Sequence, residues 1–197
     1  MDIVPELRNV IIEYIFEVGF LEREPHNGVK YLGIKDPRSV AEHSFRAAHI
    51  AIILAVMEGL DYREAAIAML FHDLPETRSG DQNLVNKKYV KVISNEMDIL
   101  GKQLKVFPND VQQEIKRVFG EYEEQKSDLG KIEKDADVLE LAFSLQEYKA
   151  NGLSGTELFL KNLKERLYSE PAKKIFDNLV SKDDINDWWY KGVLNLN

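Results

Sequence analysis

The chain has 197 residues, 44% of them hydrophobic, and a formal net charge of −8. This length suits one domain with a sizeable core, the acidic balance argues against general nucleic-acid binding, and no window approaches the roughly 18 uncharged apolar residues of a membrane span. The absence of cysteine excludes disulfides and thiolate metal sites, and it fits a cytoplasmic protein.

Apolar residues recur at helical spacing along nearly the whole chain, and no hairpin signal or βαβ alternation interrupts them. The predicted helices cover approximately residues 4–20, 40–58, 62–74, 87–104, 110–119, 128–150, 154–168 and 171–180. Residues 23–39, with two prolines and two glycines, are expected to form a long loop. The fold class is therefore predicted to be all-α, a single domain of roughly seven to nine helices.

Capping residues set the expected ends of the two central helices. Ser39 is the expected N-cap of the helix that stops at Gly59. Asp61, with a glutamate three residues later, gives a capping-box-like start to the next helix. Pro75 should end that helix one residue earlier, because proline disfavours the α conformation in the residue before it. The stretch FHDLPETRSGD, residues 71–81, therefore marks a helix end.

Four polar side chains occupy helical positions where burial is costly. His43 lies on an apolar helix, His72 and Asp73 are adjacent at a helix end, and Asp137 lies among apolar neighbours. A buried carboxylate needs a cation or several donors, and Lys134, one turn earlier, is the alternative partner for Asp137. Two imidazoles and two carboxylates from three helices make a coherent ligand set for one divalent ion. Such donors suit Mn²⁺, Co²⁺, Fe²⁺, Zn²⁺ or, less well, Mg²⁺.

Other polar or aromatic residues are expected to be structural. His49 lies about 240° around the helix from His43, so it cannot share that site, and a core or boundary position is expected. Asp135, next to other charged residues, is expected on a solvated face. The aromatic DWWY, residues 187–190, is expected to serve in packing, with a subunit interface as the alternative.

The polar motifs resemble those of the HD-domain metal-dependent phosphohydrolases. That family's pattern is a His, then a His-Asp pair, then a later Asp, matched here by His43, His72, Asp73 and Asp137. The phrases SVAEHSFR and FHDLPETRSGD further resemble the small HD proteins that act as 5′-deoxynucleotidases. This resemblance covers about residues 5–150 and leaves 151–197 as a C-terminal helical extension of a single HD domain, residues 1–197. It implies an all-α bundle with a central metal, and a homodimer.

The resemblance also implies a substrate and roles for residues in the FHDLPETRSGD loop. Glu76 matches the acidic residue used near the attacking water, and Asp81 matches the aspartate of the family's Gly-Asp step. The expected reaction is hydrolysis of a (deoxy)nucleoside 5′-monophosphate. Arg46, one turn from His43, and Arg78 are candidates to bind the phosphate, with surface ion pairing as the alternative for each.

Two other functions are weighed against this one. Some HD proteins hydrolyse guanosine tetraphosphate or cyclic nucleotides, but those enzymes are usually longer or need further ligands. A metal-stabilised binding protein without turnover is the third possibility. The short chain favours the monophosphatase, and the retained Glu76 argues against a purely structural site.

One segment departs from the pattern of the relatives. In EPHNGVKYLG, residues 24–33, Val29 stands where relatives carry a nucleotide-contacting tryptophan. Gly28 or His26 stands at the position of their arginine. Tyr31 and His26 are the candidates to replace these contacts. The preference for a particular nucleotide or sugar therefore does not transfer with the chemistry.

Overall fold

The structure is a computed structural model, described here for residues 5–91, 93–182 and 184–195. Its helices are α1 (Pro5–Val18), η1 (Gly19–Glu22), η2 (Asn27–Leu32), α2 (Val40–Glu58), α3 (Tyr62–Phe71), α4 (Glu76–Ser79), α5 (Asn86–Tyr89), α6 (Glu96–Gln103), η3 (Leu104–Val106), α7 (Asn109–Glu124), α8 (Asp128–Ala150), α9 (Glu157–Lys164), α10 (Glu170–Ser181) and α11 (Asp187–Tyr190). Within these ranges no strand forms, and the prediction of an all-α fold is confirmed.

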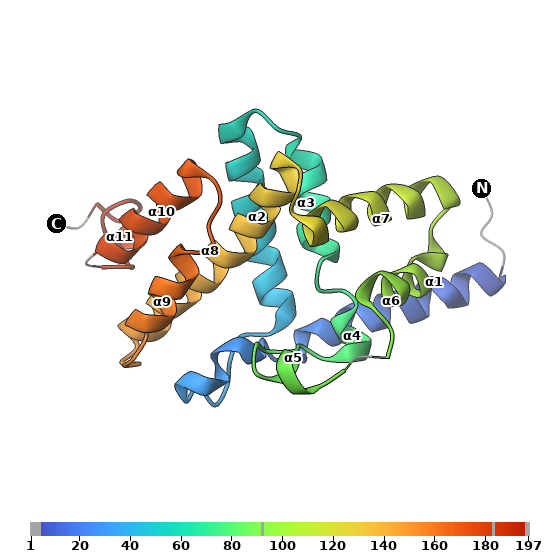
Figure 1. The fold of residues 1–197 in the computed structure, drawn as a ribbon, viewed down its shortest axis with the longest axis horizontal. Coiled ribbons are helices and arrows are strands. Elements are labelled where there is room, and N and C mark those ends of the chain that lie inside the picture. The colour runs from blue at the N-terminus through green and yellow to red at the C-terminus, as the bar shows by residue number, and fades with distance from the viewer. Residues whose placement is uncertain (1–4, 92, 183, 196–197) are drawn as a thin grey trace.

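Helices α2, α3 and α8 form the centre of the molecule (Figure 1). The inward face of α2 carries Ala47, Ala51 and Ala55, whose small side chains let the neighbouring helices approach closely. Leu139 and Leu145 of α8 are fully buried in the same core. Helices α9, α10 and α11 lie on one side of this centre, and α1, α6 and α7 lie on the other (Figure 1).

Within the described ranges, α2 is the one helix long and apolar enough to cross a membrane, judged by length and composition alone. Half of its apolar window is buried inside the fold. That buried half supplies the contacts to α3 and α8. The core of the fold therefore accounts for the apolar character of α2.

The predicted caps of the central helices are confirmed. The Ser39 hydroxyl accepts a hydrogen bond from the Glu42 amide at 3.2 Å, and the Glu42 carboxylate accepts one from the Ser39 amide at 2.8 Å. Gly59 ends α2 with a φ of 69°, a left-handed conformation that favours glycine. Asp61 caps α3 by accepting from the Arg63 amide at 2.8 Å.

Several predicted helix boundaries are wrong, and one of them is the end of the helix after Asp61, which stops at Phe71 and not near Leu74. The helix expected over residues 87–104 is two helices, α5 and α6, and Asn95 opens the second by accepting a hydrogen bond from the Asp98 amide. The helix expected to end at Phe119 continues to Glu124. There Arg117 pairs with Glu121 one turn later, at 2.6 Å, and supports the extra turn.

Asp135 is buried and not part of a solvated face, contrary to the prediction. Its two carboxylate oxygens accept hydrogen bonds from the backbone amides of Tyr168 and Ser169, at 2.7 and 2.8 Å. These amides precede α10, and Leu163 and Phe176 of the C-terminal helices belong to the same core cluster as α2 and α8. The C-terminal helices are therefore anchored to α8 by both polar and apolar contacts.

Glu133, in the same helix, is fully buried, and neither of its carboxylate oxygens has a hydrogen-bond partner among the described residues. Burial, with Glu121 and Glu64 nearby, raises the pKa of Glu133 to about 8. The folded protein therefore holds a proton that the unfolded chain releases above its ordinary pKa of 4.5. This proton linkage lowers the free energy of unfolding as the pH rises from about 4.5 to about 8.

Glu133→Gln is expected to raise the free energy of unfolding at pH 8 by about 2 kcal/mol, because the amide needs no proton to stay neutral. At pH 5 the gain should nearly vanish. Urea unfolding at both pH values measures the difference, and Glu124→Gln, at an exposed position of α7, is the control. A gain of equal size at both pH values would contradict this explanation.

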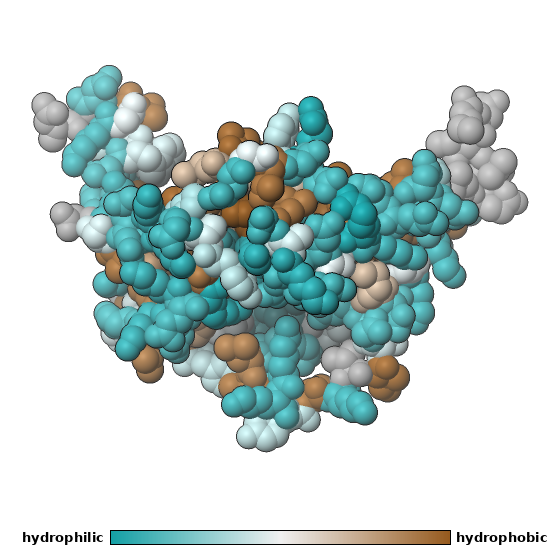
Figure 2. All heavy atoms as spheres, turned by 45° about the horizontal axis from the view of Figure 1, so that its top comes forward, coloured by the Kyte–Doolittle hydropathy of each residue, from teal (hydrophilic) through white to brown (hydrophobic). Residues whose placement is uncertain are grey.

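The surface is mostly hydrophilic, in keeping with the net charge, but apolar side chains gather near the middle of one face (Figure 2). On α2 the outward-facing Phe45, Ile53 and Val56 are 66%, 54% and 61% exposed. His49 lies on the same side of the helix and is exposed, with its ring 4.8 Å from that of Phe45. The expectation of a core or boundary position for His49 is therefore wrong.

Candidate metal centre and adjoining pocket

Three segments of the chain bring the four predicted donors together. His43 lies in α2 and is fully buried. His72 and Asp73 follow α3 in the turn that leads to Pro75. Asp137 lies near the middle of α8. The packing of α2 against α3 and α8 therefore places side chains from distant parts of the sequence at one point.

The donor atoms face one another at short range. Nε2 of His43 lies 3.2 Å from Nε2 of His72, 3.5 Å from Oδ2 of Asp73 and 3.3 Å from Oδ1 of Asp137. Nε2 of His72 is 3.0 Å from the same Asp73 oxygen. Two nitrogens and two oxygens at this spacing can share one ion.

Each imidazole is held through its other nitrogen. Nδ1 of His43 lies 2.6 Å from a carboxylate oxygen of Glu140, and Nδ1 of His72 lies 2.8 Å from the carbonyl oxygen of Met69. Acceptors at Nδ1 place the proton there and leave the Nε2 lone pair available for a metal. Two such lone pairs beside two carboxylates repel one another unless a cation lies between them. The donor set therefore fits a divalent metal ion.

The charges of the site also favour a cation. Burial opposes ionisation of Asp73, but the positive charge of a protonated His72 outweighs it and lowers the pKa of Asp73 to about 2, and a cation at the donors would act on Asp73 in the same direction. Burial likewise opposes ionisation of Asp137, yet Lys134 and His43 hold its pKa well below the ordinary value. Both carboxylates are therefore anionic at neutral pH.

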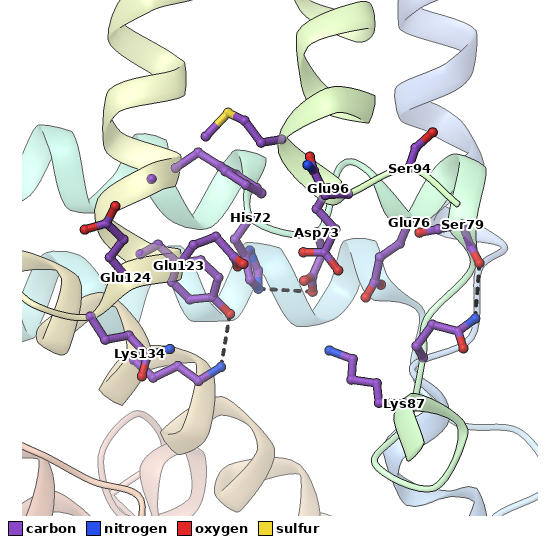
Figure 3. Close-up of a pocket in the computed structure, with 17 residues that line it drawn as sticks. His72, Asp73, Glu76, Ser79, Lys87, Ser94, Glu96, Glu123, Glu124 and Lys134 are labelled. Carbon is purple, nitrogen blue, oxygen red and sulfur yellow. Dashed lines mark hydrogen bonds and ion pairs between the residues drawn. The ribbon is translucent and has the colours of Figure 1, made fainter. Parts of the chain in front are cut away.

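A cavity of about 640 Å³ opens beside the donors and is lined by His72, Asp73 and Glu76 (Figure 3). Oε2 of Glu76 is buried and has no hydrogen-bond partner among the described residues. Burial, followed by the charge of Asp73, raises the pKa of Glu76 to about 11. A cation at the donors would lower this pKa, because positive charge stabilises the carboxylate. Glu76 thus lies next to the donors with one oxygen free.

Asp81 is held by the loop that precedes α2. Its carboxylate accepts a hydrogen bond from the backbone amide of Asn27, and its own amide donates to Glu24 at 3.1 Å. Burial, partly offset by the Asn27 bond, raises the pKa of Asp81 to about 6. In the described residues its hydrogen bonds go to this loop and not to Glu76. Asp81 therefore holds the loop that precedes α2 in place beside the site.

The two candidate phosphate-binding arginines are engaged elsewhere. Arg46 donates to Glu140 at 2.7 and 2.9 Å and to Glu147 at 2.8 Å. Arg78 donates to Glu17 of α1 at 2.6 and 2.8 Å and is not part of the cavity wall. Ion pairing, the alternative weighed for both, describes them better. The expectation that they bind substrate phosphate stays a prediction.

In the loop that departs from the relatives, the residues differ in how far they are buried and in whether they reach the metal donors. Val29 is 2% exposed and packs in the core, so it cannot replace a nucleotide-contacting side chain. Gly28 has open space around it, and Tyr31 is 61% exposed. His26 alone of these reaches the donors, with its ring centroid 4.4 Å from that of His43. Burial and the nearby His43 lower the pKa of His26 to about 4, which keeps its imidazole neutral.

Several residues of the site were not predicted as functional. Glu140, one turn after Asp137 on α8, orients His43 and holds Arg46. Helical spacing from Asp137 is the signal that could have found it. Lys134 was expected only as an ion-pair partner, and the structure confirms that pair at 2.6 Å. Lys87 carries no signal in the sequence that separates it from neighbouring lysines.

The fold and this cluster define the class of protein. A sequence model of the family described as HD domain matches residues 18–179. The chain belongs to the HD domain family, and the resemblance drawn from His43, the His72-Asp73 pair and Asp137 is confirmed at the level of the family.

Two curated relatives and one solved structure are similar to this chain over most of its length. The chain is 28% identical to the 5′-deoxynucleotidase hdd1 of Schizosaccharomyces pombe, over 90% of this chain and 92% of the relative. It is 27% identical to the 5′-deoxynucleotidase HDDC2 of Bos taurus, over 71% of this chain and 68% of the relative. Among solved structures, a conserved hypothetical protein from Pyrococcus furiosus matches with a TM-score of 0.69 and 28% identity, covering 87% of this chain and 99% of that one.

Proposed function

We propose that the protein is a metal-dependent phosphohydrolase that converts (deoxy)nucleoside 5′-monophosphates to nucleoside and phosphate. The observation that carries the proposal is Glu76, which lines a cavity together with the donors His72 and Asp73 and whose Oε2 has no hydrogen-bond partner among the described residues. A purely structural metal site needs no such carboxylate. The nature of the substrate is supported by the similarity to the two 5′-deoxynucleotidases.

His43, His72, Asp73 and Asp137 would hold the ion in this reaction. When bound, it supplies a Lewis acid for a phosphate oxygen and lowers the pKa of a coordinated water. Glu76 would take a proton from the attacking water, because it lines the cavity beside the metal donors and its Oε2 has no hydrogen-bond partner among the described residues. Glu140 keeps the proton of His43 on Nδ1, and Met69 does the same for His72.

The nitrogen and oxygen donors suit Mn²⁺, Co²⁺, Fe²⁺, Zn²⁺ or, less well, Mg²⁺. The test of the function is phosphate release from a panel of ribo- and deoxyribonucleoside 5′-monophosphates with Mn²⁺, Co²⁺ or Mg²⁺. Release should require the metal and stop with a chelator. His72→Ala removes one nitrogen donor and should stop it as well. Phosphate release that survives both treatments would overturn the proposal.

We also propose a homodimer, as the family resemblance implies. Its support in this chain is the exposed apolar stripe of Phe45, Ile53 and Val56 on α2, because such stripes commonly mark association surfaces. Light scattering coupled to size-exclusion chromatography should give twice the 22.7 kDa mass of one chain, and Ile53→Glu should lower that mass to one chain. A monomeric wild-type protein would contradict the proposal. The cytoplasmic location stays a prediction from the sequence.

A further inference from the structure

The cavity beside the donors combines carboxylates on one wall with two lysines facing them. Asp73, Glu76 and Glu96 lie together in Figure 3, and Lys87 and Lys134 lie across the open space from them. Among the described lining residues these two lysines are the only Lys or Arg side chains. We propose that Lys87 and Lys134 form a clamp for the substrate phosphate. This inference rests on the proposed function and names how the same site holds its substrate.

Lys134 is placed by the centre itself. Its Nζ lies 2.6 Å from Oδ2 of Asp137 and 3.2 Å from the Tyr122 hydroxyl. An ammonium group has three donors, so one N–H remains for the cavity that Lys134 lines. The other oxygen of Asp137 faces His43 at 3.3 Å. The Lys134 ammonium and the metal donor His43 therefore contact the two oxygens of one carboxylate, that of Asp137. This position puts the ammonium within reach of a phosphate bound to an ion at the donors.

Lys87 approaches from the opposite side. It lies in α5, whose start is fixed by the Asn83 side chain accepting hydrogen bonds from the amides of Val85 and Asn86. Its ammonium points into the space between Glu76 and Lys134 (Figure 3). In the described residues it makes no salt bridge, so its donors are available to a ligand. Lys88, the next residue, does not line the cavity.

The charge of the cavity explains why two lysines are needed. Besides Asp73 and Glu76, its wall carries Glu96 and Glu123, and the whole chain has a net charge of −8. A phosphate monoester is a dianion near neutral pH, so these carboxylates repel it. Arg46 and Arg78 do not line this cavity, so they do not offset the repulsion. Lys87 and Lys134 are the cations positioned to do so.

The decisive experiment compares Lys87→Ala with Lys88→Ala in steady-state hydrolysis of a nucleoside 5′-monophosphate with Mn²⁺. Losing one charge-assisted hydrogen bond should raise KM, and the inhibition constant of inorganic phosphate, by about 10-fold to 100-fold. Lys88→Ala should match the wild type, and Lys87→Arg should restore most of the loss. A KM and a phosphate inhibition constant of wild-type size in Lys87→Ala would overturn the clamp.

A binding measurement separates failure of the clamp from failure of the proposed function. Isothermal titration calorimetry of inorganic phosphate into the Mn²⁺-loaded protein needs no turnover. Lys87→Ala should bind phosphate about 10-fold more weakly or worse while binding Mn²⁺ as the wild type does. Phosphate binding of equal strength, or none by the wild type, overturns the clamp whether or not any substrate is hydrolysed. Phosphate binding by Lys134→Met is measured in the same way. Its Mn²⁺ affinity shows whether Asp137 still serves as a metal donor once its Lys134 partner is removed.

Discussion

Replacing Asp73 with alanine is expected to lower phosphate release on the order of 1,000-fold and to weaken Mn²⁺ binding in parallel. Asp73 contributes an oxygen 3.0 Å from Nε2 of His72 and 3.5 Å from Nε2 of His43. Its removal deletes one of four donors and an anionic charge that offsets the ion. A bound metal contributes several kcal/mol to stabilising a phosphoryl transition state, which corresponds to a loss of this size.

The measurement pairs the rate of phosphate release with the Mn²⁺ dissociation constant for the same protein. Asp36→Ala is the matched control, because Asp36 is exposed and away from the donors. Thermal unfolding of each variant without metal should show that the fold is retained. Loss of activity in Asp73→Ala with unchanged Mn²⁺ affinity would contradict the role of Asp73 as a ligand.

Replacing Glu76 with glutamine is expected to lower kcat by about 100-fold to 10,000-fold while leaving Mn²⁺ affinity close to that of the wild type. The amide keeps the size of the side chain but cannot take a proton from water, and proton transfer by a positioned base contributes rate factors of this order. Glu76 lines the cavity, its Oε2 has no hydrogen-bond partner among the described residues, and it is not one of the four predicted metal donors.

The pattern of the two effects distinguishes a base from a ligand. If Glu76 bound the metal, Glu76→Gln would weaken Mn²⁺ as Asp73→Ala does. Glu124→Gln provides the control for the charge of the cavity, since Glu124 lines it at an exposed position. A wild-type kcat for Glu76→Gln would remove Glu76 from the proposed mechanism.

Local rules in the sequence were sufficient for the parts of the fold that depend on neighbouring residues. The caps at Ser39, Gly59 and Asp61 involve contacts within four residues, so they could be predicted individually. His43, the His72-Asp73 pair and Asp137 were also predictable, because a buried polar group on an apolar helix needs a partner whatever the topology.

The errors lie where a contact joins distant segments. Asp135 looks like part of a charged surface in sequence, yet its partners are amides more than 30 residues away. Arg46 is occupied by Glu140 and Glu147, which helical spacing from His43 cannot reveal. Lys87 lies in a helix of only four residues, too short for a periodic pattern to show that it lines the cavity.

The position of Asp135 on α8 has a thermodynamic consequence for the metal centre. Asp135 and Asp137 are two residues apart, so they point to nearly opposite sides of the helix. One carboxylate anchors the segment before α10, and the other faces the metal donors. Docking of the C-terminal helices and occupancy of the metal site therefore both favour the same placement of α8. By reciprocity, a metal ion that binds the ordered α8 also stabilises the attachment of helices that never touch it.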